Sequence, residues 1–196
     1  YKRQCLIGSA LLFYAGWELI IVGLLCVLFA FLYTTGPYPL SYNGWGDVLV
    51  IVFFGFVPVG GTYYVQALTW TSDTTVASLI CGLLIDTLLV VNNYRDREAD
   101  ARSGKRTVIV RFGEKFGRYL YLMLGVAASL LCFWFFFEGH LFAALLPLLY
   151  LIPHVLTWRR MVQIHSGKKL NSILGETSRN MLLMGILLSI GFLIRH

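Results

Sequence analysis

Charged residues are scarce in this chain of 196 residues. Asp, Glu, Lys and Arg make up 13% of it, whereas about 25% is typical of a soluble domain. Hydrophobic residues make up 58%, and the mean hydropathy is +0.72. This composition excludes an ordinary soluble globular domain, and we predict a polytopic membrane protein.

Signals for a zinc cluster or a nucleic-acid partner are also lacking. The four cysteines form no CxxC pair, and no histidine lies near them at ligand spacing. The net charge is +6, but the basic residues fall between apolar stretches, where the positive-inside rule already places Lys and Arg. We therefore predict membrane lipid as a partner and no nucleic acid.

Five apolar stretches are long enough to cross a bilayer, since a spanning helix needs roughly 20 residues. We place them at residues 48–69, 74–94, 116–137, 140–158 and 174–194. The segments 92–118 and 158–172 hold 8 and 4 Lys/Arg respectively, while the turns near Asp73 and His140 hold none. The two basic segments are therefore predicted to face the cytoplasm and the two turns the opposite side.

The first apolar region, residues 5–33, is harder to interpret. Its 29 residues are too few for two full spans and too many for one untilted helix. The charge pattern calls for an even number of crossings here. Either residues are missing around 14–17, which we favour, or one long helix places Tyr1 outside. The absence of an initial Met suggests a fragment.

A densely charged stretch, NNYRDREADARSGKRT, occupies residues 92–107. Asn92, Asp96 and Asp100 recur every four residues, so on a helix they share one face. Oxygen ligands of this kind suit Mg2+, which commonly binds one or two carboxylates together with substrate phosphates. Cations that can neutralise phosphate oxygens are interspersed or follow: Arg95, Arg97, Arg102, Lys105 and Arg106. The spacing alone equally fits a solvated helix with i,i+4 charge pairs.

Residues 92–113, NNYRDREADARSGKRTVIVRFG, resemble the second aspartate motif of the UbiA-type intramembrane aromatic prenyltransferases. They are most similar to the 1,4-dihydroxy-2-naphthoate polyprenyltransferase branch, with its NNxRDxxxDxxxGKxTLxVRLG pattern. Residues 33–42, YTTGPYPLSY, resemble that branch's loop before the fifth helix, and residues 53–66, FFGFVPVGGTYYVQ, resemble the helix itself.

The resemblance implies an all-α transmembrane bundle around a central cavity, with about six to seven of nine spans in this sequence. It implies an Mg2+-dependent enzyme of the bacterial inner membrane. Such an enzyme transfers a polyprenyl group from polyprenyl diphosphate to 1,4-dihydroxy-2-naphthoate, with decarboxylation, to give demethylmenaquinone. Prenyl transfer to another acceptor, such as 4-hydroxybenzoate or a haem precursor, and a membrane transporter or lipid-binding protein are the alternatives.

The resemblance also implies roles for individual residues. Asp96, Asp100 and Lys105 are the expected catalytic residues, and Asp96, Asp100 and Asn92 the expected Mg2+ ligands. The expected substrate-binding residues are Asn92, Asn93, Arg95, Arg102, Tyr63, Tyr64 and Gln66. Aromatic faces can stabilise an allylic cation, for which Tyr33 is a further candidate by position, together with Tyr63 and Tyr64.

Several other residues invite an interpretation. Asp86 lies inside a predicted span, where an ionisable group is costly, so it either serves function or stays protonated against Thr87. Asn43 is a candidate for binding the acceptor ring. Gly60 and Gly61 are candidates for close helix approach. Glu176 and Arg179, three residues apart, are expected to pair with each other.

The resemblance is incomplete at one point. The first aspartate motif of these enzymes, of the NDxxDxxxD type, does not occur between Tyr1 and Tyr33. We therefore interpret residues 1–196 as a single transmembrane prenyltransferase domain that represents the C-terminal part of a longer enzyme. With half of the metal site, this polypeptide by itself is expected to be inactive, and prenyl transfer by it alone would contradict that expectation.

Overall fold

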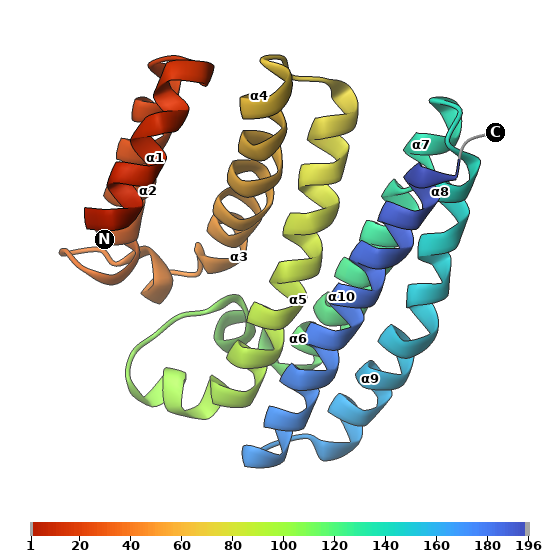
Figure 1. Ribbon diagram of the computed structural model, residues 1–196. Helices are drawn as coiled ribbons and strands as arrows, with labels where there is room; N and C mark the ends of the chain where they lie inside the picture. Colours follow the sequence, from red (N-terminus) through yellow and green to blue (C-terminus); the bar gives the residue numbers. More distant parts are fainter. Residues whose placement is uncertain (1, 195–196) are drawn as a thin grey trace.

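The computed structural model is built from helices and describes residues 2–194 (Figure 1). No strand occurs in that part of the chain. The α-helices are α1 (Lys2–Ala15), α2 (Glu18–Thr34), α3 (Gly46–Val50), α4 (Gly61–Ala67), α5 (Ser72–Arg102), α6 (Val108–Leu131), α7 (Trp134–Phe137), α8 (Leu141–Leu145), α9 (Leu151–Ile164) and α10 (Asn171–Leu193). The π-helix η2 (Ile51–Gly60) and the 3-10 helices η1 (Leu40–Tyr42), η3 (Leu146–Tyr150) and η4 (Lys168–Leu170) complete the set.

Five helical runs are long and apolar enough to cross a membrane. They are Gly46–Ala67, Ser72–Arg102, Val108–Phe137, Leu141–Ile164 and Lys168–Leu193, and they confirm the five predicted spans. Large apolar side chains are widely exposed, with Phe13 at 89% and Phe137 at 81%. Exposing so much apolar surface to water would be unfavourable, whereas its contact with lipid is favourable. The chain is an integral membrane protein.

Loops of different charge lie at opposite ends of the bundle (Figure 1). The basic loops after α5 and after α9 share one end with the loop between α2 and α3. The turns before α5 and before α8 lie at the other end, where Trp134 Nε1 donates a 2.8 Å hydrogen bond to Asp73 Oδ1. The predicted grouping of loops is confirmed, and we call the end with the basic loops the charged end.

The N-terminal region forms a helical hairpin. Helices α1 and α2 have 14 and 17 residues, and the chain reverses between them at Gly16 and Trp17 (Figure 1). The single long helix is therefore wrong. The hairpin supplies two helices, an even number as the charge pattern requires, although each is shorter than a typical span of roughly 20 residues.

Helices η2 and α5 approach each other closely at two glycines. A Cβ atom on Gly55 would lie 2.5 Å from Ser78 O, and one on Gly82 would lie 2.9 Å from Ile51 O. Small residues permit such backbone contact in membranes. The prediction that Gly60 and Gly61 serve this purpose is wrong, because a Cβ on Gly60 would meet only the Trp70 side chain and one on Gly61 would meet nothing within 4 Å.

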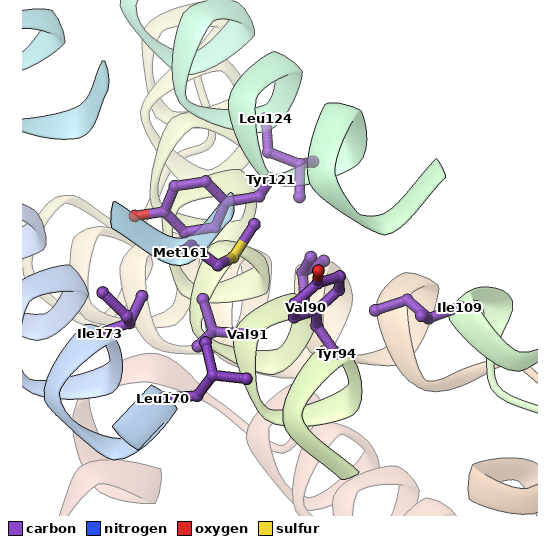
Figure 2. Close-up of a cluster of buried hydrophobic side chains, with 9 residues drawn as sticks. All are labelled: Val90, Val91, Tyr94, Ile109, Tyr121, Leu124, Met161, Leu170 and Ile173. Carbon is purple, nitrogen blue, oxygen red and sulfur yellow. The ribbon is translucent and has the colours of Figure 1, made fainter. Parts of the chain in front are cut away.

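One face of α5 is locked into the core near the charged end. Val90, Val91 and Tyr94 are fully buried. Figure 2 shows them surrounded by side chains from α6, α9, η4 and α10, namely Ile109, Tyr121, Leu124, Met161, Leu170 and Ile173. Because successive residues point about 100° apart, this packing directs Asn92 and Asp96 away from the cluster.

We expect Gly55→Ala to destabilise the fold by about 1 to 3 kcal/mol, since its methyl group would overlap the backbone of α5. Gly61→Ala is the matched control, because that helical position is open and alanine favours helix by about 1 kcal/mol. Thermal unfolding in detergent measures both. Equal melting temperatures for the two variants would contradict the close approach.

Candidate functional site

Helix α5 is longer than a bilayer is thick. Its 31 residues extend about 46 Å at about 1.5 Å per residue, against a hydrocarbon core of about 30 Å. Its last turns carry Asn92, Asp96 and Asp100 and lie at the charged end (Figure 1). The predicted continuation of the helix through these three residues is confirmed, so their one-face spacing applies.

The end of α5 brings Lys105 back to Asp100. Gly104 adopts a φ of +78°, a left-handed conformation that favours glycine at a helix end. The Lys105 amide then donates to the Asp100 carbonyl at 2.9 Å, a hydrogen bond across five residues that closes the end of the helix. The Lys105 ammonium lies 3.3 Å from Asp100 Oδ2. The turn at residues 103–105 thus brings the Lys105 side chain next to Asp100.

Arg95 connects the first aspartate to its neighbours. Its Nε and Nη2 donate to the two oxygens of Asp96 at 2.8 and 2.6 Å. Nη2 also donates to Asn92 Oδ1 at 2.7 Å, and Nη1 donates to Asn171 Oδ1 at 2.9 Å. Asn171 begins α10, so the arginine links two spans. One of its five N–H groups stays free of these bonds.

The remaining cations of the motif have different surroundings. Arg97 lies 4.5 Å above the Tyr94 ring and pairs with Glu114 at 3.2 Å, so it joins α5 to α6, and a phosphate contact of Arg97 stays a prediction. The Arg106 amide donates to Tyr42 O at 2.7 Å. The side chain of Arg102 is exposed at the end of α5.

Two of the three family-like stretches meet at a small polar pocket of about 70 Å3. Tyr33 and Ser41 come from the first stretch, Asp47 begins α3, and Asn92, Asn93, Lys105 and Thr107 come from the charged stretch. Hydrogen bonds join the loop before α3 to the chain after α5, because the Arg106 amide donates to Tyr42 O and Arg111 Nη2 donates to Asn43 O at 2.8 Å. A pocket of this size holds one or two water molecules.

Two acidic residues, Asp47 on α3 and Asp86 on α5, lie close enough to interact. Asp86 is 2% exposed and interacts electrostatically with Asp47. Within residues 2–194, Oδ1 of each has no hydrogen-bond partner. Thr87 donates to Leu84 O instead, so the expected contact between Asp86 and Thr87 is wrong. Two ionised carboxylates would repel each other in these surroundings, so ionising both at once is costly.

The sequence interpretation missed Asp47 and Asn171. Asp47 is the single acidic residue of its span, and an ionisable group at a membrane boundary is a usable signal. Asn171 follows Arg95 by 76 residues and carries no such signal.

Apolar cavities adjoin the polar pocket. One of about 490 Å3 lies between η2, α5 and α10 and is lined by Phe54, Leu88, Leu174 and also Asn92. Another of about 560 Å3, lined by Tyr33, Phe53 and Phe54, lies between α2 and η2. Asn92 and Tyr33 therefore each border both the polar pocket and an apolar cavity.

The structure does not bring all predicted site residues together. Tyr63, Tyr64 and Gln66 lie on α4, about 25 Å along the helix from Asp47, toward the opposite end of the bundle. Gln66 donates within its own helix to Thr62 O. Their role in binding substrate stays a prediction. Asn43 donates to Pro39 O at 2.8 Å and orders its own loop.

The oxygen ligands fit a metal that also takes ligands from substrate. No group of three or more His, Cys, Asp or Glu side chains suited to a metal occurs in the described part of the chain. Asp96, Asp100 and Asn92 offer two carboxylates and one amide, which is the small protein share that Mg2+ accepts alongside phosphate oxygens. These residues would not form a cage for a metal without substrate.

Comparison with known proteins gives one family. A family model described as the UbiA prenyltransferase family matches residues 4–191. The 1,4-dihydroxy-2-naphthoate octaprenyltransferase of Haemophilus influenzae is 38% identical over 181 residues, which cover 88% of this chain and 56% of that protein. Its namesake in Mycobacterium leprae is 43% identical, covering 63% and 42%, and that of Escherichia coli is 39% identical, covering 65% and 43%.

The chain spans about half the length of these curated relatives. No solved structure matches it.

We expect Asn171→Ala to lower the free energy of unfolding by about 1 kcal/mol, because it removes the hydrogen bond that joins α10 to Arg95. Asn171→Asp should preserve stability, since a carboxylate accepts the same bond and adds an ion pair. Thermal unfolding of both variants tests the link, and an unchanged alanine variant would count against it.

Proposed function

This chain belongs to the UbiA prenyltransferase family, and we propose that it serves the transfer of a polyprenyl group from polyprenyl diphosphate to 1,4-dihydroxy-2-naphthoate. The relatives named for that activity support the choice of donor and acceptor. By resemblance, carbon dioxide leaves as the ring is alkylated, and the prenylated naphthoquinol that forms is the reduced form of demethylmenaquinone.

One observation carries the proposal. Asn92 lies between a charged site and an apolar cavity of about 490 Å3, so that a diphosphate at the motif would have its hydrocarbon chain directed along η2, α5 and α10. A prenyl diphosphate has the same two parts, a charged head and an apolar chain. A solvated loop without function would not need an apolar cavity beginning at its first residue.

The leaving group requires stabilisation of negative charge as the carbon–oxygen bond breaks. Asp96, Asp100 and Asn92 would hold Mg2+, which supplies that stabilisation when bound. Lys105 carries three N–H donors beside Asp100 and can turn them toward the diphosphate oxygens. The free N–H of Arg95 is available to the same oxygens, while its other donors orient Asp96.

The allylic carbon must be kept from water until the naphthoate ring attacks it. The partly open cavity lined by Tyr33, Phe53 and Phe54 provides apolar surface next to the polar pocket. Aromatic faces stabilise a cation by about 0.5 to 2 kcal/mol each, so Tyr33 is suited to this position. The new carbon–carbon bond forms as diphosphate departs toward the charged end.

The expected location follows from charge and from the relatives. The charged end carries the basic loops, and the positive-inside rule places it in the cytoplasm. The three relatives are bacterial, which supports the bacterial inner membrane. A diphosphate and an aromatic acid would then both reach the site from the cytoplasm.

Product analysis by mass spectrometry tests the function. The full-length protein in membranes is given Mg2+, a polyprenyl diphosphate and competing aromatic acids, including 1,4-dihydroxy-2-naphthoate and 4-hydroxybenzoate. We expect a prenylated naphthoquinol as the main product. Prenylated 4-hydroxybenzoate would identify the wrong acceptor, and the absence of any prenylated product would contradict prenyl transfer.

We expect Asp96→Asn and Asp100→Asn in the full-length protein each to lower kcat about 10²-fold or more, because each removes a charged ligand from the leaving-group site. Glu98→Gln is the matched control, since Glu98 is exposed on the same helix and loses the same charge. A transporter with a bystander loop would tolerate all three changes alike.

A further inference from the structure

A second basic site lies between α9 and α10. The groove there has a volume of about 380 Å3 and is lined by Arg159, Arg160 and Arg179, with Glu176, Gln163 and Leu156 among its other residues. Three arginines against one glutamate leave it a net charge of +2. None of these residues contributes to the polar pocket beside Asn92.

The floor of the groove is fixed by a polar network. Glu176 forms an ion pair with Arg160 and accepts a 3.4 Å hydrogen bond from Thr157 Oγ1. Asn180 Nδ2 in turn donates to Thr157 at 2.9 Å. The expected pair between Glu176 and Arg179 is therefore wrong. Because Arg160 of α9 pairs with Glu176, Arg179 has no acidic partner in the described residues, and it lines the groove.

Two guanidinium groups have no protein partner in the described part of the chain. Arg159 and Arg179 are both exposed and form no ion pair or hydrogen bond there. Arg179 lies eight residues after α10 begins, about 12 Å along a membrane-spanning run. The long side chain of an unpaired arginine near the membrane surface tends to extend toward polar head groups.

Apolar surface continues from the groove along α9 and the end of η3. Leu156 is 53% exposed, Ile152 63% and Leu149 52%. The spacing of 149, 152, 156, 159 and 163 keeps these residues on one face of the helical run. A phosphate held by the arginines would thus stand at the end of a strip able to contact acyl chains.

We propose that this groove binds the head-group phosphate of an anionic phospholipid at the charged end of the bundle. Guanidinium groups present paired N–H donors that match phosphate oxygens. The net charge of +2 favours an anionic head group over a zwitterionic one, and basic sites between spanning helices are suited to such lipids. The proposal does not depend on the function proposed for the charged end of α5.

Lipid retention by the full chain tests this site. The purified protein in neutral detergent is titrated with phosphatidylglycerol or phosphatidylcholine, and native mass spectrometry counts bound lipid while thermal unfolding records stabilisation. We expect the Arg159→Gln, Arg179→Gln double variant to bind phosphatidylglycerol about thirtyfold more weakly, because each cation near the surface contributes roughly fivefold. Phosphatidylcholine binding should change little.

The Lys168→Gln, Lys169→Gln double variant is the matched control. It removes the same charge from the same end of the bundle, outside the groove, and should retain phosphatidylglycerol within about twofold of the unchanged protein. Equal losses in the two double variants would show general charge attraction and overturn a defined site. Arg179→Lys keeps the charge and checks that weaker binding does not simply reflect misfolding.

Competition with inorganic diphosphate distinguishes a bound lipid from a bound soluble anion. We expect millimolar inorganic diphosphate to leave bound phosphatidylglycerol in place, because the acyl chains add apolar contact that a soluble anion lacks. Full displacement, or protection of the groove by diphosphate alone, would assign it to a soluble anion and overturn the lipid proposal.

Discussion

Helix α5 extends from the bilayer into the aqueous phase, and the two environments make different demands on it. Within the bilayer its backbone groups must be paired inside the helix, since lipid offers no hydrogen-bond partners. Beyond the bilayer the same helix continues for several turns and carries Asn92, Asp96 and Asp100 on one face. The helix is continuous across the membrane surface. The packing of its apolar part therefore also fixes the direction in which the charged face points.

That packing is tight on two sides. Gly55 and Gly82 let the backbones of η2 and α5 touch, and Tyr94 on another face is fully buried among side chains of α6, α9 and α10. Arg118 Nε donates to the Tyr94 hydroxyl at 2.9 Å, and Arg97 stacks on its ring. A rotation of α5 would disturb all of these contacts, so the orientation of Asp96 is fixed by residues that play no chemical role.

The charged groups toward the charged end of the bundle differ in their partners. Asp96 and Asp100, near the end of α5, each have their own cation in Arg95 and Lys105. Asp47 on α3 and Asp86 on α5 interact with each other and have no paired cation in the described residues. Arg159 and Arg179, on α9 and α10, have no acidic partner in the described residues, and the proposed lipid phosphate would be their counterion.

Local sequence determined whatever depends on spacing along one helix. Apolar length identified five spans, four-residue spacing placed Asn92, Asp96 and Asp100 on one face, and Gly104 ended the helix so that Lys105 returns to Asp100. Only the tertiary structure decided which distant groups meet. Arg95 donates to Asn171, Glu176 pairs with Arg160 instead of Arg179, and Asp86 interacts with Asp47, because helix rotation and crossing depend on the whole packed bundle.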